Sequence, residues 1–252
     1  MRFGALVIGD EILSGKRQDK HMSKAIETLG ARGLELAWCQ YLGDDPEFIT
    51  ATLQRTFASG DVVFSFGGIG ATPDDHTRAC AAQAAGVRLE LHPDAEREIR
   101  ARFGDEITPR RLQMGEFPQG SAIIPNPFNR IPGFSLNGHY FLPGFPQMAW
   151  PMMAWVLDTY YAELFAPGRI GERSIIVTGC GESQLIELMN ACLTRYPRCK
   201  VFSLPRMQPD RHVELGVRGD AADIATAILE LQAGVSGLGF QWSEPAVPTP
   251  AP

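Results

Sequence analysis

The chain has 252 residues, which is enough for one domain of ordinary size followed by a small one. Hydrophobic residues make up 44% of it and charged residues 21%, a balance typical of globular rather than disordered proteins. The net charge of −6 argues against nucleic acid as a partner, and no apolar run is long enough to cross a bilayer. Because the chain starts with a strand pattern and not a signal peptide, we expect a cytoplasmic protein without a membrane partner.

Three β-α units are predicted in a row at the start of the chain. Apolar runs at residues 2–9, 34–41 and 62–66 predict strands, and each is followed by a helical pattern. Consecutive β-α units predict an α/β fold with a mostly parallel sheet and helices on both faces. Ligands bind such sheets at the carboxyl ends of the strands.

Further elements divide the chain into two predicted domains. Residues 93–103 and 145–165 predict helices, and 121–124 and 139–142 predict strands separated by the irregular segment NPFNRIPGFSLNG. Ala166-Pro167-Gly168 is the predicted boundary. The predicted units are an α/β domain at 1–166, a small α+β domain of the split βαβ kind at 170–235, and a Pro-rich tail at 236–252, whose final stretch QWSEPAVPTPAP we expect to be disordered.

The strongest candidate site follows the third strand. Gly67, Gly68 and Gly70 come directly after it, and Thr72-Pro73-Asp74-Asp75 precedes an alanine-rich helix. Glycines before a helix N-terminus form a cradle for a phosphate group, because backbone N–H groups can approach the anion. Two carboxylates beside a phosphate would repel it unless a hard cation such as Mg²⁺ bridges them.

The alternative interpretation is a strand-to-helix turn in which Asp74 caps the helix. The stretch matches neither the P-loop nor the dinucleotide fingerprint, so the glycines alone do not decide between the two. Asp75 favours the site, because a helix cap needs only one carboxylate.

Acidic residues also follow the first two strands, as Asp10-Glu11 and Asp44-Asp45. Each pair could be ordinary first-turn acids that favour a helix dipole. Parallel strands bring their carboxyl ends to one edge of the sheet, so we expect these acids to lie near Asp75.

Six motifs together resemble the MoaB/Mog, or molybdopterin-binding, domain family and, within it, the amino-terminal region of the CinA (competence/damage-inducible protein A) family. GGIGATPDDHT at 67–77 resembles the signature GGxGxTxDDxT, and GDEILSG at 9–15 resembles GDELLxG. GDDPE at 43–47, PN with PGF at 125–126 and 132–134, LPGFP at 142–146 and GCGES at 179–183 extend the resemblance through the second domain.

The resemblance implies a three-layer αβα fold, a phosphorylated pterin or nucleotide-diphosphate ligand, and association into a homo-oligomer. It implies Asp44 and Asp75 as catalytic residues, and a divalent cation such as Mg²⁺, with or without K⁺, held by Asp10, Asp44, Asp74 and Asp75. The ligand-binding residues carried over from the motifs are Gly9, Asp10, Glu11, Gly67, Gly68, Gly70, Thr72, Asn126, Pro132, Gly133, Pro143 and Gly144.

Two functions remain open under this resemblance. One is metal-dependent hydrolysis of ADP-ribose-like pyrophosphates, and the other is a non-catalytic module that binds a molybdopterin-like ligand or a nucleotide in molybdenum cofactor metabolism. A degenerate scaffold acting through its surfaces is a third possibility.

The chain departs from the family pattern at several positions. Ala71 replaces a proline and His21 replaces an asparagine. In the loop that corresponds to PNxxGTAPG, the glycine, threonine and alanine are lost, and the residues at 128–131 are bulkier than the family pattern. The deamidase domain that follows in full-length CinA proteins has no counterpart in this sequence, so deamidation of a pyridine nucleotide is not expected.

Overall fold

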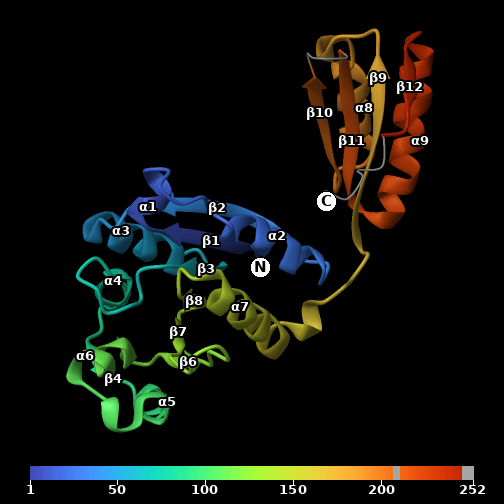
Figure 1. Ribbon diagram of the computed structural model, residues 1–252. Coiled ribbons are helices and arrows are strands. Elements are labelled where there is room, and N and C mark those ends of the chain that lie inside the picture. Colours follow the sequence, from blue (N-terminus) through green and yellow to red (C-terminus); the bar gives the residue numbers. More distant parts are fainter. Residues whose placement is uncertain (207–210, 246–252) are drawn as a thin grey trace. The chain divides into compact units, whose positions relative to one another are not determined.

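The computed structural model in Figure 1 describes residues 1–206 and 211–245. The chain forms two units, Met1–Phe165 and Ala166–Pro252. Within the described residues, each helix is too short or too polar to cross a membrane.

A six-stranded sheet forms the centre of the first unit, in the order β2-β1-β3-β8-β7-β6. The first four strands in this order are parallel, and β7 pairs antiparallel with both β8 and β6. Their bounds are β1 Phe3–Ile8, β2 Leu36–Leu42, β3 Val62–Phe66, β6 Ala122–Ile124, β7 Gly133–Leu136 and β8 His139–Leu142. Both β1 and β3 are buried throughout, as expected for apolar runs at the centre of a parallel sheet.

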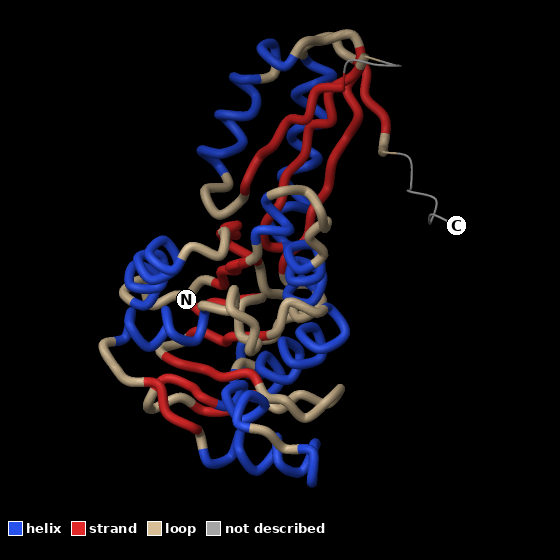
Figure 2. Tube along the Cα trace, turned by 60° about the vertical axis from the view of Figure 1, so that its left-hand side comes forward, coloured by secondary structure: helices blue, strands red, loops and turns tan. Residues whose placement is uncertain are grey.

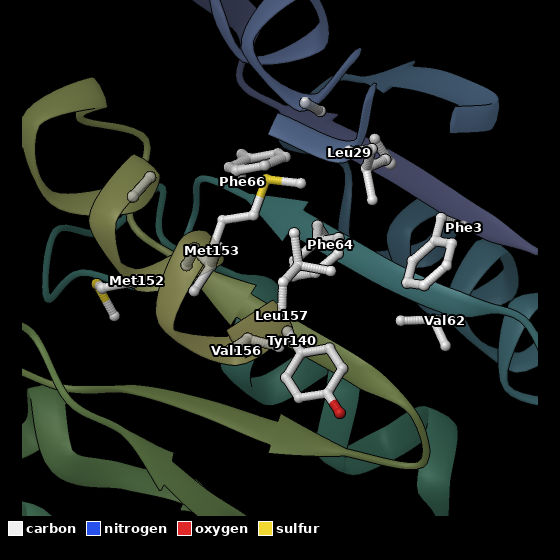
Figure 3. Packing of buried hydrophobic residues seen from close by; sticks show 14 of the residues in the cluster. Phe3, Leu29, Val62, Phe64, Phe66, Tyr140, Met152, Met153, Val156 and Leu157 are labelled. Carbon is white, nitrogen blue, oxygen red and sulfur yellow. The ribbon is translucent and has the colours of Figure 1, made fainter. Parts of the chain in front are cut away.

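Helices cover both faces of this sheet. α2 (His21–Gly30) and α7 (Pro146–Tyr160) pack on one face, and α3 (Pro46–Phe57) and α4 (Thr77–Ala85) pack on the other. Figure 3 shows Met153 and Leu157 reaching from α7 toward the buried Phe66 and Phe64 of β3. Each such side chain stabilises the fold by about 2 kcal/mol through burial. The predicted three-layer αβα architecture is confirmed.

Short elements complete the first unit. α1 (Asp10–Leu13) follows β1, and β4 (Leu89–Leu91) pairs with β5 (Glu116–Pro118) in a separate two-stranded sheet. Between β4 and β5 lie α5 (Pro93–Phe103) and α6 (Pro109–Leu112).

The second unit is a four-stranded antiparallel sheet with two helices. Its strand order is β10-β11-β9-β12, and Figure 2 shows its strands in red and its helices in blue. The elements are β9 Ile170–Thr178, α8 Ile186–Arg195, β10 Lys200–Arg206, β11 His212–Asp220, α9 Ala221–Gly237 and β12 Gln241–Ser243. This element order and strand order are those of a split βαβ layer.

Two sequence-based expectations are wrong. The predicted disordered tail begins too early, because Trp242 in β12 pairs with Val177 of β9 and its indole Nε1 donates to Ser236 Oγ at 3.1 Å. Residues 246–252 of that tail lie outside the described residues. The segment predicted to be irregular contains β7, and Asn137 and Gly138, at φ 49° and 74°, turn the chain into β8. Asn-Gly supports such a two-residue hairpin turn because both positions need positive φ.

Candidate functional site

The loops after β1 and β2 are tied together by two aspartates. The Asp10 backbone N–H donates to Asp44 Oδ2 at 2.9 Å, and the Asp44 backbone N–H donates to Asp10 Oδ1 at 3.1 Å. The neighbouring Asp45 has a different role, because its carboxylate caps α3 by accepting from the backbone N–H groups of Glu47 and Phe48. The ordinary helix-start interpretation therefore holds for Asp45, and Asp44 lies at the candidate site.

The glycine turn after β3 needs its glycines. Gly67 has φ 105°, and a Cβ there would lie 2.2 Å from the carbonyl oxygen of Ile8. Gly68 has φ 69°, and a Cβ there would lie 2.2 Å from Thr77 Oγ1. Thr77 closes the turn by donating its backbone N–H to Gly68 O and its hydroxyl to Gly67 O, at 3.0 and 3.1 Å. The ends of β1 and β3 consequently approach more closely than any larger residue would permit.

Neither acid of the Asp74-Asp75 pair caps α4. The helix begins at Thr77, and its N-cap residue makes no capping hydrogen bond through a side chain. The capping interpretation of Asp74 is therefore wrong. Asp75 Oδ2 instead accepts from the backbone N–H of Thr72 at 2.8 Å and from its hydroxyl at 2.5 Å, which holds the loop in shape.

These loops enclose a small acidic hollow of about 140 Å³. It is lined by Ile8, Gly9, Glu11, Arg17, Asp44, Gly67, Gly68, Asp74, Asp75, Gly144 and Phe145. Burial raises the pKa of Asp44, and the negative charges of Asp10, Glu11 and Asp74 raise it further, against a hydrogen bond from Asp10 that lowers it. Negative charge is thus in excess here, with Arg17 as the cation on the lining.

A larger and mostly apolar cavity of about 400 Å³ adjoins the acidic hollow. We call it the ring cavity. It is lined by Gly68, Ile69, Gly70, Ala71, Thr72, Asp75, Met114, Asn126, Asn129, Ile131, Pro132, Pro143, Gly144, Phe145 and Met148.

The loop that forms one wall of the ring cavity is held by its own amide side chains. Asn126 Oδ1 accepts from the Phe128 backbone N–H at 3.0 Å, and Asn126 Nδ2 donates to Ile131 O at 2.9 Å. Asn129 Oδ1 accepts from the Ile131 backbone N–H at 2.9 Å. These amides therefore shape the wall of the cavity.

The structure brings most of the predicted ligand-binding residues to these two spaces. Those on a lining are Gly9, Glu11, Gly67, Gly68, Gly70, Thr72, Asn126, Pro132, Pro143 and Gly144. Asp10 is on neither lining but exchanges two hydrogen bonds with Asp44. Gly133 lies within β7, where a Cβ would be 2.3 Å from the carbonyl oxygen of Phe141, so it serves strand packing.

Comparison with known proteins identifies the first unit. Residues 4–162 match the family model described as a probable molybdopterin binding domain. The chain belongs to this family. The resemblance seen in the sequence motifs is thereby confirmed.

This member of the molybdopterin-binding-domain family is also similar to CinA-like proteins. It is 31% identical over 247 residues to one from Anaeromyxobacter dehalogenans strain 2CP-1, covering 94% of this chain and 60% of that protein. It is 32% identical over 203 residues to one from Citrifermentans bemidjiense, covering 77% of this chain and 48% of that protein. The chain therefore spans about half the length of these relatives.

A solved structure titled as the protein CinA with unknown function, from Thermoplasma acidophilum, has a similar fold. The TM-score is 0.57 at 26% identity, and the match covers 63% of this chain and 98% of that one.

In this molybdopterin-binding-domain protein, the buried His21 packs against the end of β3 and contacts Gly144, which lines both cavities. Its ring stacks on Phe66 at 4.5 Å between centroids, and its Nε2 lies 3.0 Å from the carbonyl oxygen of Gly144. Because a carbonyl can only accept, Nε2 carries the proton. Burial lowers the pKa of His21, so the neutral ring is favoured.

Arg78 is a structural part of the site that the sequence did not reveal. Its guanidinium is buried, donates from Nη2 to Gly70 O at 2.6 Å, and donates from Nη1 to the carbonyl oxygens of Glu116 and Gln113. These bonds join the glycine turn to the segment after α6. The only sequence signal was one charge in an alanine-rich helix.

Proposed function

We propose that this site binds a phosphorylated pterin or a nucleotide diphosphate, and that it hydrolyses the pyrophosphate bond of an ADP-ribose-like substrate with a divalent cation. One observation carries the proposal. The acidic hollow and the ring cavity share Gly68, Asp75, Gly144 and Phe145, so a ring-sized apolar space opens directly onto glycines and carboxylates.

The two spaces suit the two halves of such a ligand. Small-molecule sites are typically apolar, with a few polar groups and volumes of roughly 300–1,000 Å³. The ring cavity, at about 400 Å³, falls in this range and has Met114, Phe145 and Met148 on its wall. The backbone of Gly67 and Gly68 supports the phosphate end, because without side chains it can approach the ligand closely.

The acidic hollow fits a hard cation that shares its coordination with phosphate. Among residues 1–206 and 211–245, no three His, Cys, Asp or Glu side chains are grouped as a ready set of metal ligands. Mg²⁺ commonly binds through one or two carboxylates, water and substrate phosphate oxygens, and the hollow offers Glu11, Asp44, Asp74 and Asp75. Bound there, the cation would neutralise the charge that develops on phosphorus during hydrolysis.

The chain's own residues divide the remaining work. Asp44 and Asp75, which both line the acidic hollow, would hold the cation and orient the attacking water. Asp10 acts through Asp44, because their reciprocal hydrogen bonds fix the Asp44 backbone. Phe145 lies on both linings and would contact the ligand where its ring meets its phosphates.

The test is to incubate the protein with ADP-ribose and Mg²⁺, Mn²⁺, Co²⁺ or Ni²⁺, and to measure the AMP released by chromatography. Asp75→Asn keeps an oxygen that can accept from Thr72 but removes the charge, so we expect folded protein with little turnover. Asp158→Asn, which loses an ion pair between Arg32 and α7, is the matched control and should retain activity. An absence of turnover across a panel of pyrophosphates with every metal would refute the hydrolase.

The self-bonded loop at residues 126–131 favours a second candidate, a binding module without turnover. The side-chain amides of Asn126 and Asn129 are already hydrogen-bonded to the backbone of their own loop, and the neighbouring side chains are bulky. Such a loop would keep the ring cavity but hold the ligand's phosphates in a position unsuited to hydrolysis. Calorimetry with a phosphorylated pterin and with ADP-ribose would detect binding. Saturation by either ligand with no product formed after prolonged incubation would support the module over the enzyme.

A further inference from the structure

A third and more open hollow, of about 660 Å³, lies beside the ring cavity. It is lined by Ala71, Thr72, Glu106, Thr108, Arg110, Arg111 and Met114. Ala71, Thr72 and Met114 also line the ring cavity, whereas no residue is shared with the lining of the acidic hollow. The ring cavity therefore adjoins both the acidic hollow and this third space, which we call the arginine hollow.

The two arginines of this hollow differ in how firmly they are held. Arg111 donates to the carbonyl oxygen of Glu106, lies 3.3 Å from its carboxylate and stacks 4.2 Å from the centroid of the Phe103 ring. Arg110 is exposed, and its Nη2 lies 3.4 Å from the carbonyl oxygen of Ala71. Such a long bond to a neutral acceptor is readily exchanged for a short bond to an anion.

The wall that carries these arginines is fixed to the glycine turn. Arg78 holds Gly70 on one side and Gln113, directly after α6, on the other. The buried Arg78, which we call the buried clamp, thus fixes the wall of the arginine hollow relative to the ring cavity.

We propose that the arginine hollow is an anion subsite for a second phosphate group, borne by the nucleoside part of the ligand and separate from its diphosphate. This inference rests on the proposed binding of a nucleotide diphosphate. Arg110 supplies the exchangeable donor, and Arg111, already neutralised by Glu106, supplies a rigid wall. The preferred ligand class is a nucleotide diphosphate phosphorylated also on its nucleoside sugar.

The test compares ADP-ribose with 2′-phospho-ADP-ribose as probes, in calorimetry on the full chain with Mg²⁺. Wild-type protein should bind the 2′-phosphorylated probe about tenfold more tightly, the scale of one charge-assisted bidentate contact. In R110Q the ratio of the two dissociation constants should fall toward one. R97Q, which removes an exposed arginine paired with Asp94 on α5, should leave the ratio unchanged.

The possible failures are distinguishable. Equal affinity of wild-type protein for both probes, or an unchanged ratio in R110Q, would overturn the subsite while leaving the proposed function in place. Binding of neither probe would overturn both. R110E provides a second variant, and in it the 2′-phosphorylated probe should bind more weakly than ADP-ribose.

Discussion

Two adjacent aspartates should have opposite consequences when replaced. Asp44→Asn removes a charge from the acidic hollow, whereas Asp45→Ala removes the cap of α3. We expect Asp44→Asn to abolish turnover or cation-dependent binding in a stable protein. We expect Asp45→Ala to retain the function in a less stable one.

The magnitudes follow from the contacts of each carboxylate. Asp45 Oδ1 accepts two backbone hydrogen bonds, both at 2.9 Å, and loss of such a cap costs about 1 kcal/mol. An asparagine at 44 can still accept from the Asp10 N–H, and it removes the repulsion that raises the pKa of Asp44. The free energy of unfolding should then change by less than about 0.5 kcal/mol. Loss of a cation ligand should lower kcat/KM by at least about 100-fold.

Urea unfolding and AMP release, measured on the same preparations, would check both expectations. Full activity in Asp44→Asn would refute the assignment of Asp44 to the site. A loss of activity in folded Asp45→Ala equal to that in Asp44→Asn would show that the whole turn matters, not one carboxylate.

Three further predictions concern the framework of the site and the core. Gly67→Ala places a methyl group 2.2 Å from Ile8 O at φ 105° and should cost about 3 kcal/mol in urea unfolding, whereas Gly30→Ala, into open space, should not destabilise. Burial lowers the pKa of His139 from 6.5 to about 4. The free energy of unfolding should therefore be highest above pH 6.5 and fall by about 3 kcal/mol toward pH 4, because the unfolded chain binds a proton that the buried ring does not. In His139→Gln this dependence of stability on pH should flatten, and an unchanged dependence would contradict the assignment to His139. Arg78→Met leaves three carbonyls without their donor and should cost about 3 kcal/mol, with the exposed Arg88→Met as a near-neutral control in thermal unfolding.

The sequence was sufficient for the layers and for the edge of the sheet where the acids gather. Strands β1 and β3 are uninterrupted apolar runs, and their parallel arrangement follows from the helices between them. From that topology alone, Asp44 and Asp75 were expected near each other, and both line the acidic hollow.

The sequence was insufficient wherever a contact depends on the exact path of a loop. The reciprocal bonds of Asp10 and Asp44 join residues 34 positions apart, and those of Arg78 and Glu116 join residues 38 apart. No local pattern encodes such pairs. β7 was missed for another reason, because it is only 4 residues long and the Asn137-Gly138 turn that forms its hairpin with β8 was not recognised.

The buried clamp at Arg78 has a consequence for how the site responds to ionic strength. Arg78 is only 8% exposed, so mobile ions cannot approach its charge closely, and this charge acts on the glycine turn at any salt concentration. The charge of the exposed Arg110 is screened as salt rises. The attraction of the site for an anion thus has two parts. The part due to Arg78 persists at high salt concentration, and the part due to Arg110 disappears there.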